Sequence, residues 1–303
     1  MSRVNRPRHP KKRRKNPTSP RCSRRTFIKG AAGVATSALV ANQFAPSSEA
    51  FREYLPYDRS RDAHYGFNYG WLQHHHPSTD ETTDEKFVFV RLKYPGGDWY
   101  TNAVDWYRWG FGKASDVQFA EVLAQTTSIE VETHQHAQYV SIDDEHLFDY
   151  PYIFMTGHIG IHLSKVQVRR LREYLERGGF IHAEDCDIRL DNGNGRMRPS
   201  IHHLMKQVFS DKKLERIDIS HPIYHTLYDH DEYLGGDKLL PEYESRYGHF
   251  DEAIMIDDRI VVYFCPTDLN CAWEGRECAP GGEDQRDWAF RQGINVVAYA
   301  LSR

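Results

Sequence analysis

The chain has 303 residues with 39 Lys and Arg, 43 Asp and Glu and 17 His, which gives a formal charge of −4 at pH 7. Residues 1–50 hold 12 of the basic side chains and one acid, so the rest carries 27 basic and 42 acidic side chains, a charge of −15. An acidic body argues against nucleic-acid binding, 40% hydrophobic and 13% aromatic residues exclude a disordered chain, and no apolar run reaches the roughly 18 residues of a membrane span.

The first 50 residues have the order of an export signal. A long basic stretch ends in the pair Arg24 and Arg25, a Gly- and Ala-rich apolar stretch follows, and small residues lead to Ala50. This order indicates a signal peptide over 1–50 that is cleaved after Ala50. The paired arginines resemble the twin-arginine signal, which predicts a periplasmic or exported protein. The alternative is a basic disordered tail before a soluble helix.

Residues 51–86 are polar and contain three adjacent histidines, His74 to His76. We interpret this segment as a linker or as a strap over the domain that follows. Three adjacent histidines can bind a metal ion, although such a run is more often a solvated patch. Residues 87–303 are then expected to form the folded domain, with no transmembrane segment in the mature chain.

Apolar periodicity predicts an α/β domain. The predicted strands are 87–94, 128–132, 152–156, 180–183 and 260–265, and the predicted helices are 115–125, capped by Ser115, 164–177 and 285–301. The helix at 164–177 is the clearest, because Ser164 and Gln167 have the spacing of a capping box and a Gly pair ends it. The order strand, helix, strand around this helix predicts a mostly parallel central sheet with helices on both faces. Residues 186–200 and 228–250 are expected to be long loops.

Polar and aromatic side chains follow four of the predicted strands. Ligands of open α/β sheets bind at the carboxyl ends of the strands, so we expect a ligand-binding rim there. Its predicted residues are Asp98, Trp99, His158, Asp185 and Asp268. A metal at this rim would use His158 and Asp185, and such mixed ligands suit zinc or iron.

Several ordered motifs resemble a bacterial family, domain of unknown function 4159. They include Arg91-Leu-Lys-Tyr-Pro-Gly-Gly-Asp-Trp-Tyr100, Thr156-Gly-His158 and Asp268-Leu-Asn-Cys-Ala-Trp-Glu274, and the likeness covers about residues 87–300. The resemblance implies a flavodoxin-like fold of the class I glutamine amidotransferase-like superfamily. It implies no agreed activity. Because such proteins tend to be associated with von Willebrand-type and AAA-ATPase proteins, it also implies a periplasmic or membrane protein partner.

The superfamily also implies a test for catalysis. Its catalytic members place a Cys on a glycine-flanked turn after a strand, and a His-x-Glu pair activates the thiol. Here Cys186 follows the fourth predicted strand, and His230 and Glu232 match the pair. The neighbours of Cys186 are aspartates rather than glycines, however, and nearby carboxylates raise the pKa of a thiol.

Three functions are therefore compatible with the sequence. The leading interpretation is a non-catalytic ligand- or protein-binding module, because the glycines of the catalytic turn are missing. The second is a hydrolase acting at the carboxyl rim, by Cys and His or with a metal. The third is a carbohydrate-binding or carbohydrate-processing module, since Trp99 begins a cluster of aromatic residues that can stack on sugar rings.

Overall fold

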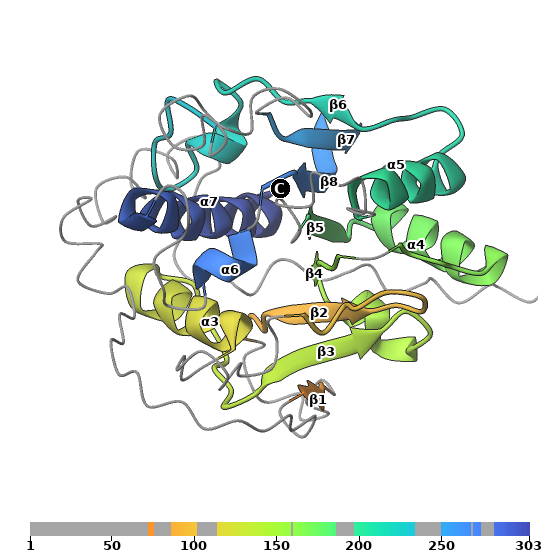
Figure 1. Cartoon of the computed structure of the whole chain (residues 1–303), viewed down its shortest axis with the longest axis horizontal. Coiled ribbons are helices and arrows are strands. Elements are labelled where there is room, and N and C mark those ends of the chain that lie inside the picture. The colour runs from red at the N-terminus through yellow and green to blue at the C-terminus, as the bar shows by residue number, and fades with distance from the viewer. Residues whose placement is uncertain are drawn as a thin grey trace, which may run out of the picture.

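The computed structural model describes residues 72–75, 86–101, 114–158, 160–185, 197–233, 250–267, 269–273 and 282–303. These residues build one eight-stranded sheet with helices packed against it (Figure 1). The strands are β1 (Leu72–His74), β2 (Val90–Lys93), β3 (Ala137–Ser141), β4 (Tyr152–Met155), β5 (Phe180–Glu184), β6 (Glu215–Arg216), β7 (Glu252–Ile256) and β8 (Arg259–Cys265).

The sheet is mostly parallel, in the order β1-β3-β2-β4-β5-β8-β7-β6. Every neighbouring pair from β1 to β8 is parallel, whereas β7 pairs antiparallel with β8 and with β6. The predicted α/β class with a mostly parallel sheet is thus confirmed. The antiparallel edge was not predicted. It arises because Asp257 and Asp258, at φ 50° and 60°, form a two-residue hairpin turn between β7 and β8.

Helices cover both faces of this sheet. The helices are α3 (Ser115–Thr126), α4 (Lys165–Glu176), α5 (Met197–Val208), α6 (Leu269–Trp273) and α7 (Gly282–Ser302), with 3₁₀ turns η3 (Glu145–Asp149) and η4 (Pro222–Tyr224). Helices α3, α6 and α7 pack on one face, and α4 and α5 pack on the other (Figure 1). No helix in the described part of the chain is both long enough and apolar enough to cross a bilayer.

The predicted βαβ unit is confirmed in detail. The Ser164 side chain accepts a hydrogen bond from the Gln167 backbone, and the Gln167 side chain accepts one from the Ser164 backbone, so the capping box is complete. Gly178 ends the helix at φ 108°, a conformation that L side chains rarely adopt. Strand β5 then pairs in parallel with β4, as expected for two strands joined by a crossover helix, here α4.

Two local predictions were wrong. Residues 128–132 form no strand beyond a single bridge from Val131 to Phe87, and the strand β3 begins only at Ala137. Ser115 is not the cap of α3, because Ala114 holds that position without a side-chain bond. The Ser115 hydroxyl is instead bound to Asp116 and to the guanidinium of Arg91, a buried charge pair that recruits it away from the helix end.

The predicted signal peptide, residues 1–50, lies outside the described residues. Arg24, Arg25 and the predicted cleavage site after Ala50 lie outside them too. Within the segment predicted as linker or strap, Leu72–His74 form the edge strand β1, which pairs in parallel with β3. The predicted loop 186–200 ends earlier than expected, because α5 begins at Met197.

Candidate functional site at the carboxyl edge of the sheet

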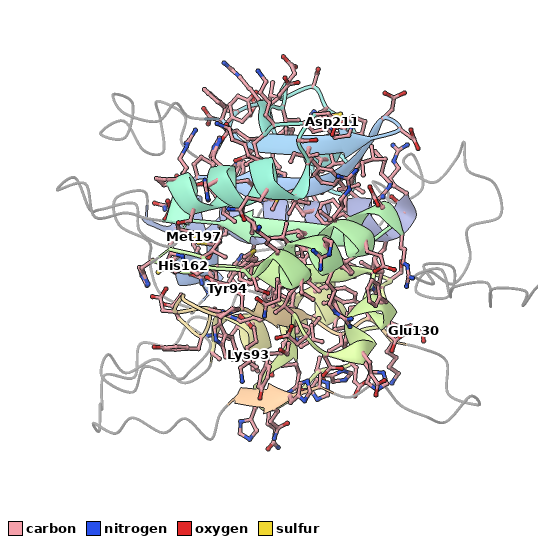
Figure 2. All side chains as sticks on the ribbon, turned by 90° about the vertical axis from the view of Figure 1, so that its right-hand side faces the viewer. Lys93, Tyr94, Glu130, His162, Met197 and Asp211 are labelled. Carbon is pink, nitrogen blue, oxygen red and sulfur yellow. The ribbon has the colours of Figure 1, made fainter. Side chains whose placement is uncertain are left out.

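The strands β2, β4, β5 and β8 lie next to one another and run in the same direction. Their carboxyl ends therefore meet at one edge of the sheet, where ligands bind in open α/β folds. Figure 2 shows three residues from this edge, Tyr94, His162 and Met197, close together on one side of the molecule, with Glu130 on the opposite side. The sequence-predicted rim residues within the described part of the chain, Asp98, Trp99, His158 and Asp185, fall on the segments that leave these strand ends.

Asp98 and His158 form the central contact of this edge. The backbone N–H of His158 donates to Oδ1 of Asp98 at 2.8 Å, and Nδ1 of His158 lies 2.6 Å from Oδ2. The side chains are 36% exposed for His158 and 19% for Asp98. Two contacts from one carboxylate fix both the backbone and the ring of the histidine, so the pair is held in a single orientation that solvent can reach.

Gly157 makes this pairing possible. A Cβ atom at this position would lie 2.6 Å from the Tyr94 hydroxyl and 2.9 Å from Oδ1 of Asp98. The Tyr94 hydroxyl donates to the carbonyl of Thr156 at 2.8 Å, which holds the end of β4 against the end of β2. The chain can pass between these groups only because glycine has no side chain.

A buried arginine supports the loop that carries Asp98. The guanidinium of Arg91, in β2, donates to both carboxylate oxygens of Asp116, in α3, and the Nε to Oδ2 distance is 2.6 Å. The same guanidinium donates to the carbonyls of Trp99, at 2.9 Å, and Thr101. Arg91 is 1% exposed. Because these carbonyls follow directly after Asp98, the ion pair in the core positions the exposed pair at the edge.

Glu184 is fully buried at the end of β5 and joins three elements. Its Oε1 accepts a hydrogen bond from the Thr156 hydroxyl at 2.7 Å, and its Oε2 accepts from the backbone N–H groups of Leu269 at 2.8 Å and Asn270 at 2.9 Å. It thereby satisfies the first N–H groups of α6 and fastens them to β4. This carboxylate is used in holding the fold.

Asp185 has a comparable structural role at the next residue. Its Oδ2 accepts from the backbone N–H of Arg198, in the first turn of α5, at 3.1 Å, and the side chain is nearly buried. The groups of three potential metal ligands within the described residues include neither Asp185 nor His158. A metal bound by His158 and Asp185 stays a prediction, since neighbouring residues such as Cys186 lie outside the described part of the chain.

Two aromatic residues, Trp99 and Tyr100, follow Asp98 in the chain. The Trp99 ring packs at 5.1 Å from the Tyr139 ring and lies 5.7 Å from the ammonium of Lys93, so its indole is partly covered. Tyr100 stands edge-on to Trp99 at 5.9 Å and is 37% exposed. Tyr100 thus offers an accessible aromatic surface two residues after Asp98, whereas Trp99 is partly used in packing.

The two described residues of the predicted catalytic group lie around Trp288. His230 is 5% exposed and packs against the Trp288 ring at 4.6 Å, tilted by 41°, and the backbone carbonyl of Glu232 accepts from the indole N–H at 3.1 Å. Burial, together with the charge of Arg291, lowers the pKa of His230 to about 3. An imidazole with so low a pKa is a weak base. Cys186 lies outside the described residues, so the thiol mechanism stays a prediction. The predicted rim residue Asp268 lies outside them as well.

Sequence reasoning missed the supporting residues of this edge, above all Arg91 and Tyr94. Arg91 did leave a signal, because a charged residue in the middle of an apolar strand requires a partner when it is buried. Arg91 and its partner Asp116 are 25 residues apart in the sequence, and Asp98 and His158 are 60 residues apart. No local sequence pattern reveals contacts over such separations.

A comparison with protein families gives one result for this chain. A family model described as domain of unknown function (DUF4159) matches residues 88–301, a span that begins before β2 and ends within α7. The match includes every described rim residue discussed above. No curated protein matches the chain.

Proposed function

The chain belongs to the DUF4159 family of domains of unknown function, and from the geometry of its carboxyl edge we propose that it is a non-catalytic ligand-binding module. The proposed site is the Asp98–His158 pair with the exposed ring of Tyr100 beside it. The proposed ligand is a small polar molecule, or a polar group of a partner protein, that exchanges hydrogen bonds with the imidazole and the carboxylate.

One observation carries this proposal: the polar groups of the edge divide into buried and accessible ones. Glu184 and Asp185 accept backbone N–H groups at the starts of two helices and are 0% and 7% exposed. The Asp98–His158 pair is partly exposed and is held from behind by Gly157 and by the Arg91 ion pair. A preorganised and accessible polar pair on a rigid edge loses little entropy when it binds a ligand.

The wider setting belongs to the same proposal. We propose export by the twin-arginine route to the periplasm, supported by the residue order around Arg24, Arg25 and Ala50. We also propose a flavodoxin-like fold of the class I glutamine amidotransferase-like superfamily, supported by a mostly parallel sheet with helices on both faces. A periplasmic or membrane protein would then be a natural partner of the exposed edge.

Ligand screening with matched variants tests the proposed site. The purified chain is screened by thermal shift against small amides, carboxylic acids, amines and oligosaccharides, and each hit is titrated by calorimetry. We expect H158Q and D98N to weaken a hit at least tenfold, since a hydrogen bond to a charged group contributes about 1.5–3 kcal/mol. The matched control is H146Q, which removes the His146–Asp149 pair, an exposed pair of the same kind at 2.8 Å. Hits whose affinity H158Q and D98N leave unchanged would contradict the proposed site.

A second candidate function is hydrolysis, favoured by one specific observation. A carboxylate bonded to Nδ1 is the arrangement that orients a histidine as a general base, and Asp98 holds this position at 2.6 Å from His158. The same variants therefore enter an assay with chromogenic esters, amides and glycosides. Turnover that falls at least a hundredfold in H158Q or in C186S would replace the non-catalytic proposal. A glycoside or oligosaccharide hit lost in Y100A would instead favour carbohydrate as the ligand.

A further inference from the structure

The segment that leads into β3 is irregular. Phe87 pairs with Val131, and Val90 pairs with Gln138. The chain thus takes seven steps from Val131 to Gln138 while its neighbour takes three, so this strand has four more residues than its partner between the two pairings. We call the segment between Val131 and β3 the β3 bulge (residues 132–136); it carries a glutamate and two histidines. A bulge re-aims the side chains of its strand.

The edge strand β1 lies against this bulge. It pairs with β3 over three residues, and the N–H of His75 extends the pairing by donating to the carbonyl of Tyr139 at 2.9 Å. His75 is 9% exposed. Its ring lies 5.4 Å from the ring of His134, nearly perpendicular to it. The sheet therefore brings a histidine from the segment 51–86 next to the β3 bulge.

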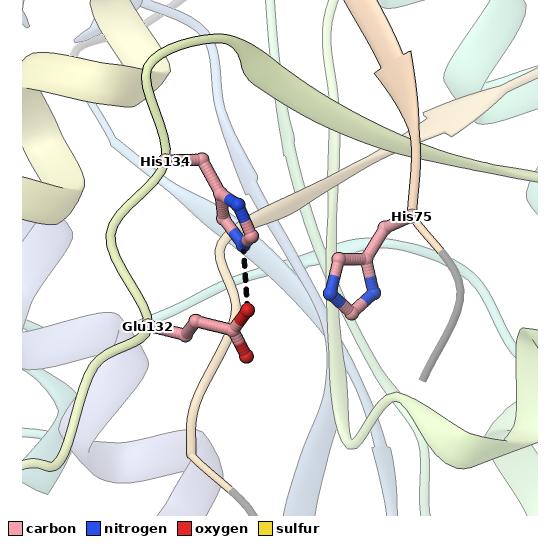
Figure 3. A group of neighbouring side chains, drawn as sticks. All are labelled: His75, Glu132 and His134. Carbon is pink, nitrogen blue, oxygen red and sulfur yellow. Dashed lines mark ion pairs between the residues drawn. The ribbon is translucent and has the colours of Figure 1, made fainter. Parts of the chain in front are cut away.

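Three potential metal ligands converge at this point. One ligand atom each from His75, Glu132 and His134 lies within 4.8 Å of the others, and the Nε2 of His134 is 3.3 Å from Oε1 of Glu132 (Figure 3). Zinc binds nitrogen and oxygen ligands at about 2.0–2.2 Å in a tetrahedron, which places the ligand atoms about 3.4 Å apart. The ligand atoms, at most 4.8 Å apart, would approach one another by up to about 1.4 Å to reach that geometry.

Tyr150 orients the ring of His75. The Tyr150 hydroxyl lies 2.6 Å from Nδ1 of His75 and 3.1 Å from the carbonyl oxygen of the same residue. The short contact occupies Nδ1, so Nε2 is the ring nitrogen that would bind a metal. Figure 3 shows a ring nitrogen of His75 facing Glu132 and His134. Metal-binding histidines are oriented in this way by a second group on the far nitrogen.

His134 is already turned toward Glu132. Its Nε2 is shielded from solvent, and its partner is Oε1 of Glu132 at 3.3 Å, longer than a usual N–H···O hydrogen bond. A buried ring nitrogen with only this long contact is poorly satisfied, and a metal ion between the two groups would bind both. Together with the oriented His75 and the anionic Glu132, this atom completes a set of two nitrogens and one oxygen. Zinc accepts such a set and leaves a fourth position for water.

We propose that His75, Glu132 and His134 form a Zn²⁺ site that fastens the edge strand β1 to the β3 bulge. The site shares no residue with the Asp98–His158 site and does not depend on the proposed function. Its three ligands come from two segments separated by more than fifty residues, so the ion would act as a cross-link that holds β1 on the sheet.

Zinc titration of the full chain, purified without a histidine tag, tests the proposal. We expect one Zn²⁺ per chain by calorimetry, a Tm that rises with zinc, and the visible spectrum of a tetrahedral site when Co²⁺ replaces zinc. E132Q and H134Q should each weaken zinc binding at least tenfold and abolish the cobalt spectrum. Y150F should weaken it about tenfold, because loss of an outer-shell partner costs 10–100-fold in metal affinity.

Two controls separate this site from the other histidines. H225Q removes a His–Asp pair of 3.0 Å elsewhere on the surface, and H74Q removes a member of the histidine run that pairs with Asp144 instead. Both should bind zinc like the wild type. Glu132 is 48% exposed, so E132Q should fold like the wild type without metal, as circular dichroism checks. Unchanged affinity in E132Q and H134Q, or zinc lost in H74Q or H158Q but not in H134Q, would overturn the proposal.

Discussion

The two faces of the sheet are built from different kinds of side chain. Toward α4 and α5 the core consists mainly of Val, Leu, Ile and Met. Toward α3, α6 and α7 it consists largely of rings, and the Trp273 ring lies 4.3 Å from that of Phe119 and 5.3 Å from that of Phe154. Strand β5 shows the contrast in one segment, since Ile181 belongs to the aliphatic core and Phe180 to the aromatic one. We call these the aliphatic face and the aromatic face.

The aromatic face also holds the most deeply buried charged and titratable groups. His182 is 0% exposed between the rings of Phe154 and Tyr263, and Nδ1 lies 2.7 Å from the Tyr152 hydroxyl. Asp251 accepts hydrogen bonds from two tyrosine hydroxyls, Tyr224 at 2.8 Å and Tyr263 at 2.5 Å. Rings can enclose such groups because tyrosine offers an apolar body and a hydroxyl. The aromatic face, which includes the Arg91–Asp116 pair behind the carboxyl edge, therefore depends on buried polar contacts as well as on rings. The aliphatic face depends mainly on apolar burial.

Among the substitutions considered, loss of the buried ion pair of the aromatic face should destabilise the protein most. R91M removes the partner of Asp116 and leaves a carboxylate uncompensated in the core, which should cost about 3–5 kcal/mol of unfolding free energy. Urea unfolding followed by circular dichroism measures it. The double variant R91M/D116L should recover part of the loss, because two apolar side chains replace the pair.

The matched control for this prediction is an ion pair on a helix of the aliphatic face. Arg172 and Glu176 of α4 pair at 2.8 Å, and both side chains are nearly half exposed. R172M should leave the urea midpoint almost unchanged, since exposed pairs contribute little. If R91M and R172M shifted the midpoint equally, the contrast between the two faces would fail.

The next effect concerns pH and Asp251. Burial, opposed by the hydrogen bonds from Tyr263 and Tyr224, raises the pKa of Asp251 from 3.8 to about 6. Between these two values the folded protein keeps a proton that the unfolded chain releases. The contribution of Asp251 is therefore fully present below pH 3.8 and is lost as pH rises through about 6, a change of about 3 kcal/mol.

D251N removes this titration while its amide oxygen can still accept from the tyrosines. The unfolding free energy of D251N minus that of the wild type should therefore rise between pH 4 and pH 6.5 and then level off, as urea unfolding at each pH measures. His182, whose pKa burial lowers to about 3, acts in the opposite direction, but it is present in both proteins and cancels in the difference. A difference that stays constant with pH would show that Asp251 titrates normally.

The sequence predicted those parts of the molecule that depend on neighbouring residues and missed those that depend on contacts between distant segments. The unit β4, α4 and β5 was predicted correctly because the Ser164–Gln167 capping box and Gly178 act locally. Strand β3 was misplaced because the β3 bulge separates the Phe87–Val131 bridge from the rest of the ladder. Asp98 and His158 could be placed after strand ends, because strand ends can be read from apolar runs. Their contact with each other depends on packing between distant segments, as does the contact of Glu184 with the start of α6.

The smallest expected effect tests how tightly the aromatic face is packed. Inside a helix, Gly to Ala normally stabilises by about 0.8–1 kcal/mol. At Gly293, in α7, a Cβ atom would lie 2.6 Å from Cε2 of Phe119 and 2.7 Å from Cζ2 of Trp273. Overpacking of this kind costs about 1–3 kcal/mol, so G293A should destabilise the protein by about 1 kcal/mol, measured by urea unfolding. In an F119L background one of the two obstructing ring edges is gone while Trp273 stays, so G293A should there cost less than in the wild type, a coupling that identifies the Phe119 contact as part of the cause. Stabilisation by G293A in the wild type would mean that the rings yield, and the aromatic face would then be no more rigid than the aliphatic one.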